Sequence, residues 1–143
     1  VEDRTRELSK ANEDLKTEVE RRKENEIIIR NSEEFNRSVF ENSPDCVKIL
    51  DLDGAIRAMN KNGLCLMEIE DFSQFAGKNW INFWENEDAE ASYQAVQAAR
   101  DGQTARFEGF CPTAKGTAKW WDVSVSPIFG ADGKPKSLIA TST

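Results

Sequence analysis

The first 34 residues carry apolar side chains at intervals of seven. One series, taken as the d positions of a heptad repeat, is Leu8, Leu15, Arg22 and Ile29. The companion series at a is Thr5, Asn12, Val19 and Glu26. This segment has no glycine or proline and more than half of its residues are charged, so it is either one long helix or a disordered polyampholyte. The heptads favour a helix that pairs with a second copy as a parallel coiled coil.

The polar positions of this seam indicate its strength. Asn12 at an a position favours two strands in register, at some cost in stability. Glu18 at g and Lys23 at the following e have the spacing of an interchain ion pair in a parallel dimer. Arg22 and Glu26 weaken the seam, so a single solvated helix supported by ion pairs four residues apart remains the alternative. The homodimer interface that we expect consists of Leu8, Asn12, Leu15, Val19 and Ile29, together with Trp120.

The pattern changes after Ser43-Pro44, because the residue before a proline is disfavoured in the α region. Residues 46–50 predict a strand, the Asp-Gly turn in 51–54 predicts a hairpin, and residues 55–59 predict its second strand. Residues 60–101 predict helices, with Asn60 and Asp71 as caps of short ones and the longest over 87–100. Three more strands follow over 104–111, 119–126 and 137–141.

This order of elements predicts an α+β fold, with a five-stranded antiparallel sheet that carries its helices on one face. We expect two parts: a signalling helix over 1–34 and a folded domain over 35–143. In residues 119–126, Trp121, Val123 and Val125 alternate with polar residues and belong to the core face. Trp120 then points to the opposite face, where it is expected to cover a helix end around 29–39 or a partner subunit.

Composition excludes several classes of protein. The net charge of −7 and the pI near 4.8 argue against nucleic acid and against an anionic membrane surface. Histidine is absent, which excludes histidine-dependent nucleophiles and histidine-ligated haem or zinc within this segment. The three cysteines, Cys46, Cys65 and Cys111, are widely spaced, and we expect all three to be reduced thiols in the cytoplasm that serve as small buried apolar residues.

No apolar run is long enough to cross a bilayer. The chain starts without Met and ends abruptly, so we expect an excerpt of a longer protein, with room for a membrane tether upstream. No nucleophile–base set, phosphate-binding loop or metal-ligand spacing is present, so we expect no enzyme activity in this segment. Asp51 and Asp53 flank a turn and are expected to stabilise it rather than to act as paired catalytic carboxylates.

Several short motifs, taken in order, resemble a PAS domain. They are Phe40-Glu41-Asn42-Ser43-Pro44-Asp45, Asp51-Leu52-Asp53-Gly54, Asn60, Gly77-Lys78-Asn79-Trp80, Asp101-Gly102, the segment 120–128 and Asp132-Gly133. The helix before them resembles the linker that precedes PAS domains in bacterial sensor histidine kinases of two-component systems. The resemblance implies sheet order 2-1-5-4-3, a homodimer, a small-molecule pocket between sheet and helices, and signal relay through flanking helices to a kinase or other output domain in the same chain.

The resemblance also bears on cofactors. In the blue-light flavin subfamily a G-x-N-C motif carries the cysteine that bonds to flavin, whereas Trp80 holds that position here. A cysteinyl-flavin adduct is therefore not expected. Haem-binding relatives ligate the iron through histidine, which this chain lacks, so haem is not expected either, and the cofactor is unknown. The candidate pocket residues are Asn79, Trp80, Phe83, Trp121 and Ser124. Three functions stay open: a ligand sensor and dimerisation module, a constitutive protein–protein adaptor with a pocket filled by side chains, and a flavin-based redox sensor.

Overall fold

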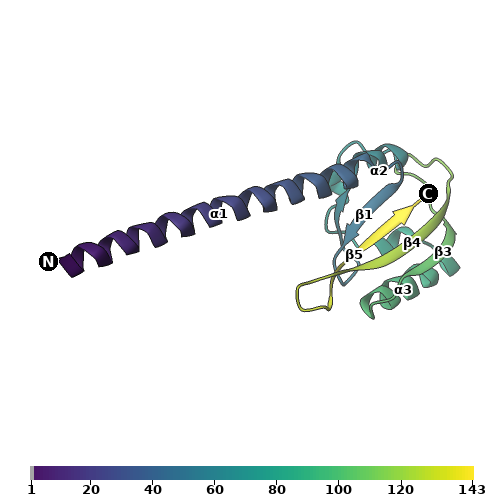
Figure 1. The fold of residues 1–143 in the computed structure, drawn as a ribbon. Helices are drawn as coiled ribbons and strands as arrows, with labels where there is room; N and C mark the ends of the chain where they lie inside the picture. Colours follow the sequence, from purple (N-terminus) through teal and green to yellow (C-terminus); the bar gives the residue numbers. More distant parts are fainter. Residues whose placement is uncertain (1) are drawn as a thin grey trace. The chain divides into compact units, whose positions relative to one another are not determined.

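The computed structural model describes residues 2–143. The chain divides into two compact units, one up to Val39 and the other Phe40–Thr143 (Figure 1). Helix α1 (Glu2–Asn42) makes up the first unit, and its last turn belongs to the second. Like the prediction, α1 ends just before Ser43-Pro44. The boundary between the units falls five residues after the expected end of the helical part at 34, because Phe40 is hydrogen-bonded into the folded domain.

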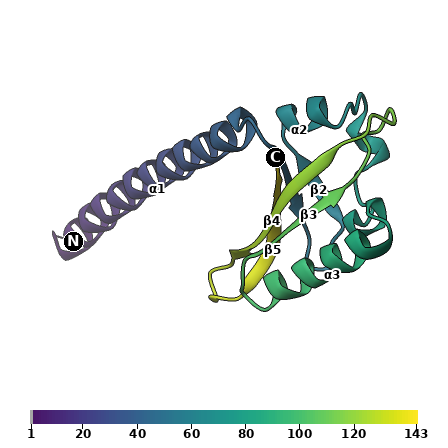
Figure 2. The ribbon, with the colours of Figure 1, turned by 90° about the vertical axis from the view of Figure 1, so that its right-hand side faces the viewer.

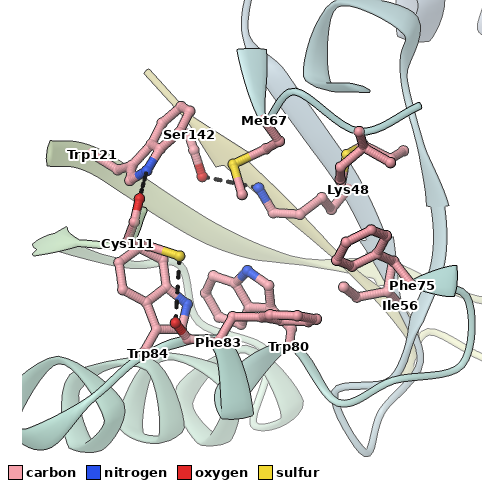
Figure 3. A pocket seen from close by; sticks show the side chains of 12 residues that line it. Lys48, Ile56, Met67, Phe75, Trp80, Phe83, Trp84, Cys111, Trp121 and Ser142 are labelled. Atoms are coloured by element: carbon pink, nitrogen blue, oxygen red, sulfur yellow. Dashed lines mark hydrogen bonds between the residues drawn. The ribbon is translucent and has the colours of Figure 1, made fainter. Parts of the chain in front are cut away.

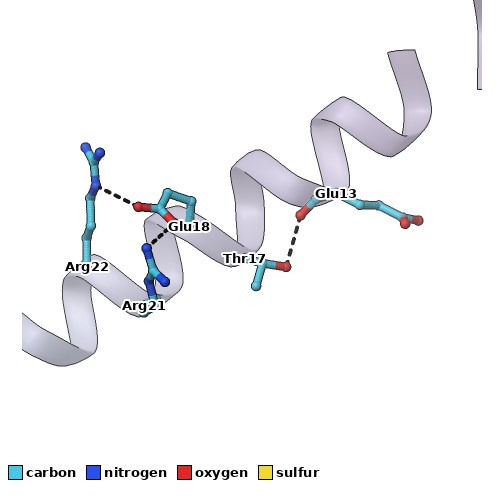
Figure 4. Close-up of polar contacts among 5 residues, drawn as sticks. All are labelled: Glu13, Thr17, Glu18, Arg21 and Arg22. Atoms are coloured by element: carbon cyan, nitrogen blue, oxygen red, sulfur yellow. Dashed lines mark hydrogen bonds and ion pairs between the residues drawn. The ribbon is translucent and has the colours of Figure 1, made fainter. Parts of the chain in front are cut away.

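The described part of α1 up to Val39 is solvent-exposed almost throughout within one chain. Glu18 accepts hydrogen bonds from Arg21 at 2.6 Å and Arg22 at 3.3 Å (Figure 4). These contacts are exposed pairs three and four residues apart, of the kind that support an isolated helix by a few tenths of a kcal/mol, about 0.2–0.5 per pair. The heptad residues Leu8, Leu15, Val19 and Ile29 are exposed, as are Ile27 and Ile28 outside the seam.

The second unit is an α+β domain built on five antiparallel strands. They are β1 (Cys46–Leu50), β2 (Ile56–Met59), β3 (Ala105–Phe110), β4 (Trp120–Phe129) and β5 (Pro135–Ser142). Their order in the sheet is β2-β1-β5-β4-β3, which confirms the predicted order. The fold class predicted from the sequence is therefore confirmed.

Helical segments lie between β2 and β3 in the chain and cover one face of the sheet (Figure 2). They are α2 (Lys61–Leu66), the 3-10 turns η1 (Phe72–Gln74) and η2 (Trp80–Phe83), and α3 (Asn86–Arg100). Asn60 and Asp71 cap α2 and η1 as predicted. α3 buries Ser92, Ala95, Val96 and Ala99, whose small side chains allow it to lie close against the sheet.

β4 is the clearest difference from the predicted elements. It continues past residue 126, and Pro127, Ile128 and Phe129 still pair with β5. β3 begins at Ala105 opposite Val125, so β4 has no partner on that side where Pro127 occurs. A proline lacks the N–H that a ladder needs and is tolerated at such an open edge.

The buried and exposed side chains of β4 lie on opposite faces of the sheet, as predicted. Trp121 is 4% exposed, and Val123 and Val125 are fully buried in the core between sheet and helices. Trp120 is 75% exposed on the other face, where its ring centroid lies 5.5 Å from that of Phe110 on β3.

Candidate ligand cavity

A small cavity lies between the inner face of the sheet and the segment from α2 to α3 (Figure 3). Its free volume is about 40 Å³. The residues that line it are Lys48, Ile56, Met59, Met67, Ile69, Phe75, Trp80, Phe83, Trp84, Cys111, Trp121 and Ser142. Drug-sized ligands occupy pockets of roughly 300–1,000 Å³, so this conformation admits only a small molecule or a few waters.

Five of the twelve residues that line the cavity are aromatic. Trp80 and Trp84 meet edge to face, with ring centroids 5.7 Å apart and an interplanar angle of 79°. The ring centroid of Phe107 on β3 lies 5.1 Å from that of Trp84 and 6.1 Å from that of Trp80, so the three rings pack together. The ring centroids of Phe75 and Phe83 lie 5.9 Å apart. Edge-to-face contacts are a favoured geometry of aromatic pairs, so the Trp80–Trp84 and Trp84–Phe107 contacts stabilise this part of the domain.

Three of the five pocket residues predicted from the sequence line the cavity, namely Trp80, Phe83 and Trp121. Asn79 lies outside it, because its side chain caps η2. Its Oδ1 accepts from Ile81 N at 3.0 Å and its Nδ2 donates to Asp53 O at 3.0 Å. Ser124 also lies outside the lining, between buried Val123 and Val125 on the strand and therefore on the outer face of the sheet.

The polar end of the cavity was not predicted. Lys48 is on the inner face of β1, between Cys46 and Leu50, and is only 5% exposed. Its Nζ donates to Ser142 Oγ on β5 at 3.0 Å (Figure 3). It also donates to Cys46 Sγ at 3.2 Å. Strand geometry places Lys48 on the same face as Cys46 and Leu50, but both faces of β1 carry apolar residues, so the sequence does not show that this face is the inner one.

Cys111, at the other side of the cavity, is a buried thiol. Burial raises the pKa of Cys111; the nearby Lys48 ammonium acts in the opposite direction, and Cys46 and Glu85 add to the increase. Its Sγ donates to Phe83 O at 3.4 Å. Cys46 is buried as well, but Cys65 is exposed, so the prediction that all three cysteines are buried is wrong for Cys65. Cys65 is therefore the thiol among the three that reagents in solution reach.

Asn60 connects the cavity-bearing domain to the end of α1, a larger role than the helix cap that its position predicts. It is fully buried, and its Oδ1 accepts from Val47 N of β1 at 3.0 Å and from Gly63 N of α2 at 2.9 Å. Its Nδ2 donates to Phe40 O and Asp45 O, both at 3.0 Å. One amide thus holds the last turn of α1, the first strand and the first short helix together.

Asp51 has the turn-stabilising role predicted for it. Its Oδ1 accepts from Asp53 N at 3.0 Å and Ala55 N at 2.9 Å, and its Oδ2 accepts from Arg57 at 2.6 Å. Desolvation alone would raise the pKa of Asp51, but the hydrogen bonds from Ala55, Arg57 and Asp53 together hold it below its usual range. Across residues 2–143, no group of three or more Asp, Glu, His or Cys side chains is arranged to bind a metal ion.

Comparison with known proteins agrees with this architecture. The family described as PAS fold matches residues 40–143, and the chain belongs to this family. Among curated protein sequences, none matches the chain significantly.

Solved structures similar to the chain are PAS domains and related light-sensing proteins. The PAS domain of an HTR-like protein from Haloarcula marismortui is 24% identical, with a TM-score of 0.68 over 85% of this chain and 98% of that one. A domain of a sensory box sensor histidine kinase/response regulator from Geobacter sulfurreducens is 17% identical, with a TM-score of 0.66 over 80% of this chain and 95% of that one. The LOV protein of Rhodobacter sphaeroides is 18% identical, with a TM-score of 0.65 over 77% of this chain and 65% of that one. Likeness at this level of identity shows the shared fold.

Proposed function

We propose that this chain is the ligand-sensing and dimerisation module of a larger cytoplasmic signal-transduction protein, with a sensor histidine kinase as the favoured parent. In this proposal the module has no catalytic activity of its own. It relays the state of the PAS cavity to an output domain through its flanking helices. Within the part of the chain that the structure describes, no helix has the length and apolar character needed to cross a membrane.

The junction at Asn60 carries this proposal. A continuous helix from Glu2 to Asn42 has its last turn hydrogen-bonded to a buried amide, and the same amide holds β1. β1 also contributes Lys48 to the cavity. A change in the cavity that shifts β1 therefore acts on the end of α1 through two hydrogen-bonded steps, which is the short connection that a relay needs.

Dimerisation through α1 is supported by the exposed heptad residues Leu8, Leu15, Val19 and Ile29. A helix with an uncovered apolar seam gains free energy by pairing, at roughly 25 cal/mol per Å² of apolar surface buried. Glu18 pairs within its own helix in a single chain, and in a parallel dimer the same carboxylate faces Lys23 of the partner helix.

Replacing Leu15 and Ile29 together by serine should convert the dimer to monomer at roughly 10–100 µM, because both side chains leave the proposed seam. Light scattering on the full chain measures this directly. Ile27 and Ile28 supply a matched control, since they are equally exposed on the same helix but lie at positions b and c. The Ile27→Ser, Ile28→Ser double variant should remain dimeric; a monomeric unsubstituted chain, or equal loss in both double variants, would contradict pairing through this seam.

The small size of the cavity favours a second candidate function, the constitutive adaptor whose pocket is filled by its own side chains. Native mass spectrometry of the purified chain separates the two functions, because a bound molecule adds mass only to the sensor. A flavin-based redox sensor would be coloured as purified. The Trp80 ring in the cavity wall and the free volume of about 40 Å³ both argue against a three-ring cofactor in this conformation.

A further inference from the structure

Lys48 is a buried cation without an anionic partner in the described part of the chain. Its Nζ has hydrogen bonds to a thiol and a hydroxyl, and neither group carries a compensating negative charge. The ion pairs among the described residues do not include it. Burial of a cation is unfavourable unless an anion or several good acceptors replace its water, so this site has an unmet electrostatic requirement.

Two further hydrogen-bond donors in the cavity wall also lack an acceptor. Trp84 Nε1 is buried and has no hydrogen-bond acceptor among residues 2–143. Ser142 Oγ accepts from Lys48, which leaves its own proton without an acceptor among the described residues. Buried polar groups are nearly always hydrogen-bonded, so a cavity with several unused donors and no carboxylate is complementary to an acceptor-rich, negatively charged group.

The remainder of the wall is apolar and aromatic. Met67, Phe75, Phe83 and Trp80 surround the space next to the Lys48 side chain (Figure 3). Such a wall favours an apolar or planar body over a polyanion or a sugar, because each polar group placed against it would lose its water without compensation. The free volume of about 40 Å³ limits that body to a small one.

From these observations we propose that the cavity binds a small organic carboxylate, with the carboxylate group at Lys48 and its apolar or aromatic body against the tryptophan and phenylalanine wall. This inference rests on the proposed sensor function and names the chemical class of its ligand. Lys48 provides the charge and orients the ligand, and Ser142 fixes the direction of Lys48 Nζ. A charge-assisted hydrogen bond is about twice as strong as a neutral one, so the charged form of a ligand should be strongly preferred over its neutral amide.

The test is a titration of the full chain with acetate, butyrate and benzoate, each compared with its amide, followed by tryptophan fluorescence and calorimetry. Trp80, Trp84 and Trp121 line the cavity, so occupancy should alter the fluorescence. At least one carboxylate should bind roughly tenfold or more tightly than its amide, as expected for one charge-assisted hydrogen bond. If no carboxylate is preferred, or if chloride alone binds and no carboxylate displaces it, the inference is wrong.

Lys48→Met keeps the length and apolar stem of the side chain and removes the charge. It should abolish the preference for carboxylate over amide, while the melting temperature stays equal to that of the unsubstituted chain or rises, because a buried unpaired charge has been removed. Lys136→Met, an exposed change on neighbouring β5, is the matched control and should bind as before. Trp84→Phe keeps most of the ring and should weaken carboxylate binding about three- to tenfold.

Failure of this inference is distinguishable from failure of the proposed function. Equal affinity of Lys48→Met and the unsubstituted chain for carboxylate would overturn the inference even if the chain were a dimer. Charge-dependent binding to a chain that stays monomeric would retain the inference and overturn the proposed relay through paired helices.

Discussion

Replacing Asn60 with alanine should lower the free energy of unfolding of the PAS domain by about 3–5 kcal/mol. The substitution leaves Val47 N, Gly63 N, Phe40 O and Asp45 O without their partner. Each buried group left unsatisfied costs roughly 1–3 kcal/mol, although part of this is recovered where water enters. Urea unfolding followed by tryptophan fluorescence measures the change, since all four tryptophans lie in the domain.

Asn62→Ala is the matched control for this prediction. Asn62 is in α2, the helix that Asn60 caps, and is only partly buried. Among the described residues its side chain makes one hydrogen bond, from Nδ2 to Ser43 O at 2.6 Å. Loss of this hydrogen bond should lower the free energy of unfolding by about 1 kcal/mol. Equal effects of the two substitutions would mean that Asn60 is an ordinary helix cap and that the junction to α1 does not depend on it.

The second large effect is expected at Trp121. Trp121→Ala should destabilise the domain by about 3–5 kcal/mol, because it removes a buried indole and leaves a cavity behind. The indole Nε1 also donates to Cys111 O at 2.9 Å, and that carbonyl would lose its partner. Thermal unfolding of the purified variant, with the ligand absent, is the measurement.

Trp120→Ala, at the neighbouring position, should lower the free energy of unfolding by less than about 1.5 kcal/mol, because it removes only an exposed aromatic contact with Phe110. We propose that Trp120 contacts a partner subunit or the helix end around residues 29–39 of a partner, so its loss should change the output of the parent protein more than its stability. An unchanged output together with unchanged stability would contradict this role. A loss of stability as large as that of Trp121→Ala would contradict the assignment of the two faces.

The strands and short helices could be predicted closely because their signals are local. Asp-Gly turns, the capping residues Asn60 and Asp71, and the alternation around Trp121 each depend on residues a few positions apart. The continuation of β4 through Pro127 was not predictable in this way. A proline is tolerated there only because β3 begins opposite Val125 and does not pair with β4 at Pro127, which is a property of the assembled sheet.

The cavity was harder to predict because its polar groups come together only in the folded sheet. Lys48 and Ser142 are 94 residues apart in the chain, yet their side chains meet through the pairing of β1 with β5. Lysine is usually exposed, and the other four residues of β1 are all apolar, so the sequence does not indicate that Lys48 points inward. In contrast, Ser124 could have been rejected from alternation alone, and Asn79 looked like a pocket residue because nothing in the sequence shows that Asp53 and Ile81 occupy its amide.

In the proposed relay, paired N-terminal helices respond to the state of the cavity. A spin label at Lys10→Cys, the outer f position, in a Cys65→Ser background reports the distance between the two helices of a dimer, because Cys46 and Cys111 are buried. Pulsed electron paramagnetic resonance should give one short distance between labels, as expected for parallel, in-register helices with axes roughly 8–10 Å apart. Saturation with the carboxylate that binds most tightly in the titration should shift this distance in the labelled chain that retains Lys48. The distance should stay unchanged in the labelled Lys48→Met variant. Absence of dipolar coupling, or identical distances with and without a ligand that tryptophan fluorescence shows to be bound, would contradict the account.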